Sequence, residues 1–219
     1  MEAAQVAGGD PICDPTILPT DSLPKGSSAD SAIMELLRED NLFMKAKRDT
    51  SWANALRNNW EYFFYVGEIN GNKNIVGYKT DSLEDEVSLD TTGLYRYKIV
   101  LDYHTHQDRF PKDRHPQDPV DLLVSNKWYQ NNLNFRSYVD CGDTLYVIVN
   151  ESTDLLKQYF KTKNLKREHS SWVIPMYNST NRRKDGMDLL LALIGASGVS
   201  GLGIYKSTDN DKLNFIKLN

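Results

Sequence analysis

A pair of histidines separated by one residue is the feature of this sequence that most directly suggests chemistry. His104 and His106 lie where the segment Tyr95–Tyr103, which has the composition of a β-strand, comes to an end. Side chains two residues apart on a strand point to the same face of the sheet. We therefore expect the two imidazoles to point the same way, as two ligands of one metal ion must.

A nearby carboxylate could complete such a site. Asp121 follows His106 by 15 positions, in Asp118-Pro119-Val120-Asp121 at the predicted start of a helix. Two histidines and one carboxylate are a common ligand set of catalytic zinc, which keeps its fourth position for water. The ion would lower the pKa of that water to about 7. The pattern predicts one Zn²⁺ per chain, and the same ligands would also accept another divalent ion.

The same residues have an ordinary structural interpretation. Two histidines on a strand are often surface or core residues. Asp118 could be the N-cap of the helix, with Pro119 in its first position and Asp121 placed favourably toward the helix dipole. The two interpretations are compatible, because a cap at Asp118 would define the helix start and direct Asp121 toward the strand end.

Three other reactive side chains are weaker candidates. His115 lies in the charged, proline-containing loop after the histidine pair and is expected to be solvated, although it could also cover the site, contact substrate or replace a ligand. His169 lies in a basic, polar stretch and is predicted to be on the surface. Cys141 lies in a predicted turn with no neighbouring base in the sequence, so a cysteine nucleophile is not favoured.

Helices and strands are interspersed along the rest of the chain, which predicts one mixed α/β domain over residues 30–219. Residues 1–29 hold four of the eight prolines and predict an irregular N-terminal arm. Helices are predicted from Asp30 or Ser31 through about Leu56, over Pro119–Asn131, from Ser152 to about Thr162, and over Met187–Ala196 with Gly198 as the stop. Strands are predicted over 60–66, 75–78, 95–103, 137–139, 144–149, 172–175, 203–206 and 213–218.

Composition excludes several classes of protein. The net charge of -4 shows no basic excess, so no nucleic-acid partner is expected. Two cysteines could form one bridge but cannot build a disulfide-rich scaffold or a cysteine-based zinc site. The longest apolar run has six residues, so no membrane span is expected, and the first ten residues lack the features of a signal peptide. These features predict a cytoplasmic protein or one exported without a visible signal.

Taken in order, the candidate residues resemble the JAB/JAMM metalloprotease family, especially its bacterial JAB-like branch. The family motif is a strand-end H-x-H, a short loop and S-x-x-D opening a helix, with a glutamate on an earlier strand. His104-Thr105-His106 and Asp118-Pro119-Val120-Asp121 match the first two elements. Glu61, 43 residues before His104 and ahead of the Asn70-Gly71 turn, matches the glutamate. The resemblance covers roughly residues 55–150.

The resemblance implies a central mixed sheet flanked by helices, in the cytidine-deaminase-like JAB/MPN architecture. It implies that His104, His106 and Asp121 ligate zinc, that Glu61 is the general acid/base, and that the substrate is a protein or peptide amide or isopeptide bond. A secreted effector is one role that it allows. Asp118 replaces the family serine, which helps to position the tetrahedral intermediate, and the loop before Asp121 is longer than usual. These departures leave a catalytically inactive binding or scaffold module as the alternative. A metal-dependent nuclease, with the same residues holding a divalent ion near phosphate, is a more distant one that the acidic net charge does not favour.

Overall fold

The computed structural model describes residues 28–79, 93–107, 114–117, 119–195 and 197–219. The predicted arm therefore lies outside the described residues except for Ser28 and Ala29, which belong to the first helix. The acidic segment 80–92 and the predicted N-cap Asp118 also lie outside them.

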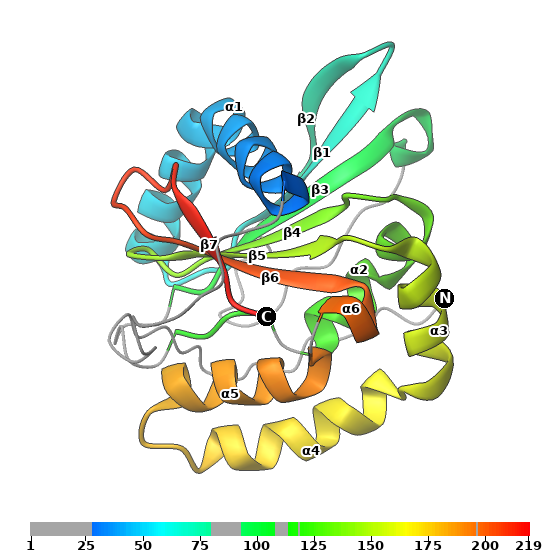
Figure 1. The fold of residues 1–219 in the computed structure, drawn as a ribbon. Coiled ribbons are helices and arrows are strands. Elements are labelled where there is room, and N and C mark those ends of the chain that lie inside the picture. Colours follow the sequence, from blue (N-terminus) through cyan, green and yellow to red (C-terminus); the bar gives the residue numbers. More distant parts are fainter. Residues whose placement is uncertain (1–27, 80–92, 108–113, 118, 196) are drawn as a thin grey trace.

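A seven-stranded mixed sheet forms the centre of the molecule (Figure 1), in the order β2-β1-β3-β4-β5-β6-β7. The β3–β4 pair is parallel, and the other neighbouring pairs are antiparallel. The mixed α/β class predicted from the sequence is confirmed. The strands are β1 Phe63–Ile69, β2 Asn72–Lys79, β3 Lys98–Thr105, β4 Arg136–Asp140, β5 Leu145–Asn150, β6 Leu202–Ser207 and β7 Phe215–Lys217.

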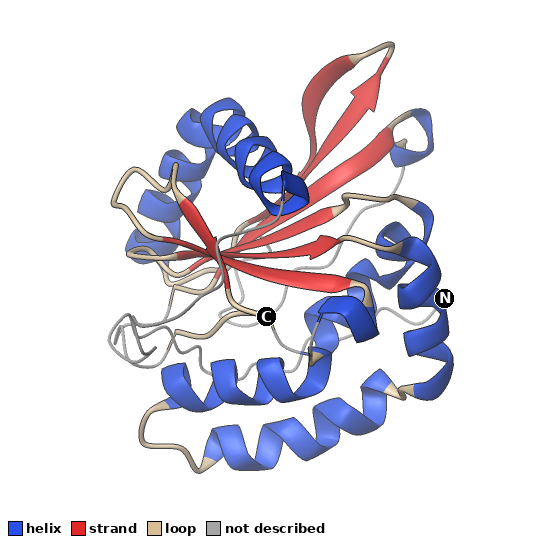
Figure 2. Ribbon diagram, in the orientation of Figure 1, coloured by secondary structure: helices blue, strands red, loops and turns tan. Residues whose placement is uncertain are grey.

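Helices cover both faces of this sheet (Figure 2). The long helix α1 packs on one face, and the later helices gather on the other. Three layers result, and the sheet contributes to an apolar core on each side. The helices are α1 Ser28–Asn58, α2 Pro119–Asn131, α3 Thr153–Thr162, α4 Leu165–Tyr177, α5 Arg182–Ile194 and α6 Ser197–Ser200, with a 3-10 turn η1 at Leu94–Arg96.

Strand alternation decides which residues face the candidate site. On β1, Phe64 and Val66 join the core beneath α1, whereas Phe63 and Tyr65 join the core beneath α2. A bulge interrupts the β1–β3 ladder, where Val66 pairs with Leu101 but Gly67 pairs with Ile99. The extra residue of β3 changes the alternation just before the histidine pair, a common position for a bulge beside a functional site.

Several local signals predicted these elements correctly. Asn70 and Gly71 both have positive φ, at 51° and 78°, and join β1 to β2 in a tight hairpin. The Ser152 side chain accepts a hydrogen bond from the Leu155 amide and caps α3. The predicted bounds of α2, Pro119–Asn131, are those observed.

Two predictions in the C-terminal third are wrong. Residues 172–175 do not form a strand but lie within α4, which Asn164 caps by accepting from the Arg167 amide. A four-residue apolar run does not distinguish strand from helix, and here Trp172 and Met176 pack together one helical turn apart. Helix α5 spans Arg182–Ile194 instead of Met187–Ala196, and the residue that ends it is Gly195, with a positive φ of 63°, not Gly198.

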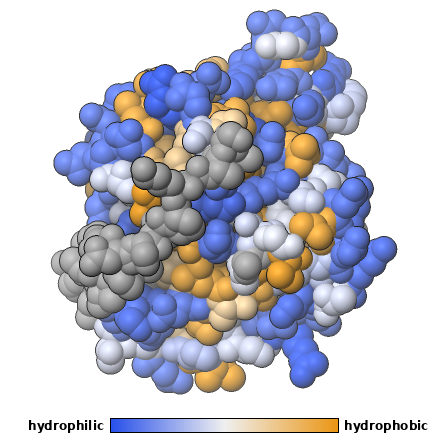
Figure 3. Space-filling model, viewed as in Figure 1, coloured by the Kyte–Doolittle hydropathy of each residue, from blue (hydrophilic) through white to orange (hydrophobic). Residues whose placement is uncertain are grey.

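The surface seen in Figure 3 intersperses apolar and hydrophilic residues. Within the described ranges, no helix has the length and apolar character needed to cross a membrane.

Candidate metal centre

The end of β3 brings Glu61, His104 and His106 together. Phe63 of β1 pairs with His104, and beyond β1 the Thr105 amide still donates to the Tyr62 carbonyl at 3.0 Å. This continued antiparallel pairing brings Glu61 close to the histidines. One potential ligand atom from each of the three lies within 4.8 Å of the other two. Glu61 itself precedes the strand, which begins at Phe63 and not at residue 60 as predicted.

His104 lies at the centre of this group and is only 3% exposed. Its ring stacks against Phe63, with 6.1 Å between the ring centroids. Among the described residues, neither ring nitrogen of His104 has a hydrogen-bond partner. A buried polar group without a hydrogen bond is costly, and among the same residues Nε2 has only an ion-pair contact, with Asp121, so it suits a bond to something the protein binds.

Asp121 approaches His104 from the first turn of α2. Its Oδ1 lies 3.5 Å from His104 Nε2. In a tetrahedral site with bonds of about 2.0–2.1 Å to nitrogen and oxygen, ligand atoms are about 3.3–3.4 Å apart. The separation therefore suits two ligands of one zinc ion. Asp121 of α2 therefore lies at the strand end. The predicted N-cap, Asp118, lies outside the described residues.

His106 is held at both its backbone and its ring. Its amide donates to the Asp140 carbonyl at 2.9 Å, and ring atom Nδ1 lies 2.8 Å from the His115 carbonyl oxygen. A carbonyl oxygen only accepts, so Nδ1 carries the hydrogen. Nε2 of the neutral ring is then the nitrogen with a free lone pair. Metal-binding histidines in proteins commonly use this arrangement.

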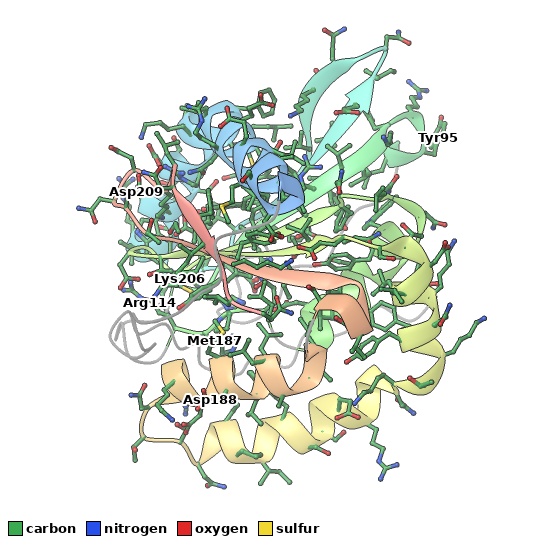
Figure 4. All side chains as sticks on the ribbon, viewed as in Figure 1. Tyr95, Arg114, Met187, Asp188, Lys206 and Asp209 are labelled. Carbon is green, nitrogen blue, oxygen red and sulfur yellow. The ribbon has the colours of Figure 1, made fainter. Side chains whose placement is uncertain are left out.

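His115 is buried, at 2% exposure, and the expectation of a solvated loop histidine is wrong. Its ring packs edge-on against His106, with centroids 4.5 Å apart, and against Trp172 of α4 at 5.0 Å. The side chain before it, Arg114 (labelled in Figure 4), donates to the Cys141 carbonyl at 2.9 Å. Trp172 of α4 packs against the ring of His115, and that contact could not be inferred from the polar sequence around His115.

The electrostatic environment shifts the pKa values of the two histidines in opposite directions. Burial alone would lower the pKa of His104, but the nearby Asp121 and Glu61 carboxylates outweigh it and raise that pKa to about 9. Burial, with His115 and His104 adding to it, lowers the pKa of His106 well below its usual value. The carboxylates of Asp121, Glu61 and Asp102 thus favour positive charge at His104, as they would favour a bound cation.

Two functional candidates were not found from the sequence. Asp102 precedes His104 by two residues on β3, and Ser125 follows Asp121 by one turn of α2; Ser125 donates to Asp102 at 2.5 Å. Their spacing from the histidine and the aspartate is the signal that could have identified them. The side chain of His169 lies outside the described residues.

Comparisons with protein-family models, with curated proteins and with solved structures found no match to this chain.

Proposed function

We propose that this protein is a zinc-dependent hydrolase that cleaves a peptide, isopeptide or related amide bond in a protein or peptide substrate. The observation that carries the proposal is the convergence of Glu61, His104, His106 and Asp121 from three separate parts of the chain. These residues lie just before a strand hairpin, at a strand end and at a helix start, and this is the order of the JAB/JAMM motif.

The donor set fits zinc. The two imidazoles and the carboxylate of Asp121 would hold the ion, because the His104–Asp121 separation of 3.5 Å is close to the edge of a zinc tetrahedron. The compact three-residue group contains Glu61 in place of Asp121. We assign Asp121 as the ligand because it stands where the JAB/JAMM motif has its ligand aspartate and its Oδ1 lies 3.5 Å from His104 Nε2. Glu61 then remains to contact the attacking water. Another divalent ion would fit the same donors.

Glu61 is the residue proposed to move protons. When bound, zinc lowers the pKa of a water and polarises the carbonyl to be attacked. The Glu61 carboxylate accepts the proton of the attacking water and passes it to the leaving amine. Glu61 is half-buried, so it is open to a substrate, whereas His104 and His106 are buried. His106 keeps its ring orientation through the bond to the His115 carbonyl.

The experiment that tests this function is hydrolysis of a panel of fluorogenic peptides and lysine-linked isopeptides by the zinc-loaded protein. Cleavage that a chelator abolishes, that added zinc restores and that His104→Ala lacks would support the proposal. A zinc-loaded, folded protein that cleaves no member of the panel would favour the inactive scaffold instead.

A further inference from the structure

A second polar contact joins β3 to α2, two residues before His104 on the strand and four residues after Asp121 on the helix. Asp102 lies on β3 and its side chain is fully buried. Its Oδ2 accepts a hydrogen bond of 2.5 Å from the hydroxyl of Ser125, which is also buried. Within the described part of the chain, Oδ1 of Asp102 has no hydrogen-bond partner. A buried carboxylate depends strongly on the few bonds it makes, so this contact is a strong constraint.

The contacts His104–Asp121 and Asp102–Ser125 are separated by nearly the same distance along β3 and along α2. Two residues of a strand span about 6.6 Å, and four residues of a helix rise about 6 Å. Asp102 and His104 are two residues apart on β3, and Asp121 and Ser125 are four apart on α2. The pairs His104–Asp121 and Asp102–Ser125 are therefore successive links between the same two elements.

A metal centre tolerates displacements of only a few tenths of an ångström in its ligands. A helix packed by apolar side chains alone can slide or rotate by more than that at modest cost, because apolar contacts are not directional. A short hydrogen bond to a carboxylate fixes both the distance and the rotation of the helix. The link made by Ser125 lies one turn from Asp121 and so controls where the Asp121 carboxylate lies.

We propose that Asp102 and Ser125 are positioning residues of the metal centre: their hydrogen bond sets the register of α2 on β3 and thereby holds Asp121 against His104. This inference rests on the proposed function, because it assigns the pair a task at that same site. Asp102 and Ser125 do not themselves contact the ion in this arrangement. They act through His104 and Asp121.

The test is Co²⁺ binding, read both as affinity and as the visible d–d absorption spectrum, which reports ligand geometry. Ser125→Ala removes the link and should weaken binding by about 10- to 100-fold, the range found when outer partners of metal ligands are lost. The d–d bands should also shift. Ser125→Thr, which keeps the hydroxyl, should recover most of the affinity and the spectrum.

A matched control separates positioning from general stability. Ser200 is buried, and its hydroxyl accepts from the Leu202 amide at 3.1 Å, in a part of the fold outside the site. Ser200→Ala should lower the melting temperature but leave the Co²⁺ affinity and spectrum unchanged. If Ser125→Ala does not fold, Asp102→Asn replaces it; weakening the same bond should lower the affinity by about 3- to 10-fold.

The outcomes distinguish the two proposals. Wild-type protein that binds Co²⁺, together with a Ser125→Ala or Asp102→Asn variant of unchanged affinity and spectrum, would overturn the positioning role and leave the metal centre intact. Wild-type protein that binds neither Co²⁺ nor Zn²⁺ would overturn the metal centre, and the positioning role with it.

Discussion

At the residue scale, the proposed function gives Glu61, which is half-buried, a different task from His104 and His106, which are buried. The replacement Glu61→Gln keeps the shape of the side chain and removes its basic oxygen. Since Asp121, not Glu61, is assigned as the ligand, the variant should still bind one zinc. Its hydrolytic rate should fall by about 10²- to 10⁴-fold, the usual contribution of a general base. Metal analysis and peptide turnover of the variant check the two expectations. A variant that loses its zinc together with its activity would contradict the assignment of Glu61 as a base that does not bind the ion.

The raised pKa of His104 leads us to expect that zinc binding releases a proton. With a pKa of about 9 in the metal-free protein, His104 is protonated at pH 7, and zinc must displace that proton to reach the nitrogen. Zinc binding at pH 7 should therefore release about one proton from His104, and the affinity should rise about tenfold per pH unit up to about pH 9. His106, whose pKa is lowered, should release none.

Calorimetry of zinc binding in buffers of different ionisation enthalpy measures this release. The variant His106→Ala should still release the proton, whereas His104→Ala should not. An affinity that stays constant between pH 6 and 8 would show that His104 is not the protonated ligand.

At the scale of elements, α4 packs against His115, the residue whose carbonyl oxygen contacts the ring of His106. Trp172 is buried against Met176 and against the ring of His115, whose carbonyl orients His106. Trp172→Ala should cost about 3–5 kcal/mol in the free energy of unfolding and weaken zinc binding. Ile174, on the same helix but 67% exposed, is the control, and Ile174→Ala should change stability by no more than about 0.5 kcal/mol.

Denaturant unfolding and zinc titration of the two variants give the comparison. If Trp172→Ala loses stability but the folded protein binds zinc with unchanged affinity, α4 is only a part of the core. If Trp172→Ala and Ile174→Ala change stability and zinc affinity equally, Trp172 does not support the position of His115.

Prediction of the elements succeeded where a local signal was strong. The Asn70-Gly71 turn, the Ser152 cap and the proline at the start of α2 each act through neighbouring residues, and each was identified from the sequence. The strand predicted over 172–175 failed because a short apolar run has no period of its own. The burial of His115 and the Asp102–Ser125 bond depend on packing between distant segments, which no local pattern contains.

At the scale of the whole molecule, a buried ion cluster joins α1 to the sheet on the side away from α2. Asp40 of α1 accepts from Arg136 of β4 at 2.6 Å, from Tyr138 at 3.1 Å and from Lys73 at 3.0 Å. Asp40→Ala would leave the Arg136 charge buried without this partner and should cost about 3–5 kcal/mol. Glu39→Ala, at an exposed neighbouring position, should cost no more than about 0.5 kcal/mol.

Because this cluster lies on the opposite face of the sheet from the candidate ligands, Asp40→Ala should lower stability without changing the zinc affinity of the protein that remains folded. Denaturant unfolding with and without zinc checks this. A large loss of zinc affinity in the folded variant would show that the two faces of the sheet are coupled.

His104 and His106 are proposed to hold one metal ion together. The most direct measurement is the metal content of the purified protein by inductively coupled plasma mass spectrometry, before and after zinc is added back at neutral pH, beside the double variant His104→Ala/His106→Ala. We expect about one zinc per chain in the wild type and none in the double variant. No bound metal in a folded wild type, even after zinc is supplied, would contradict it, as would equal zinc in both proteins.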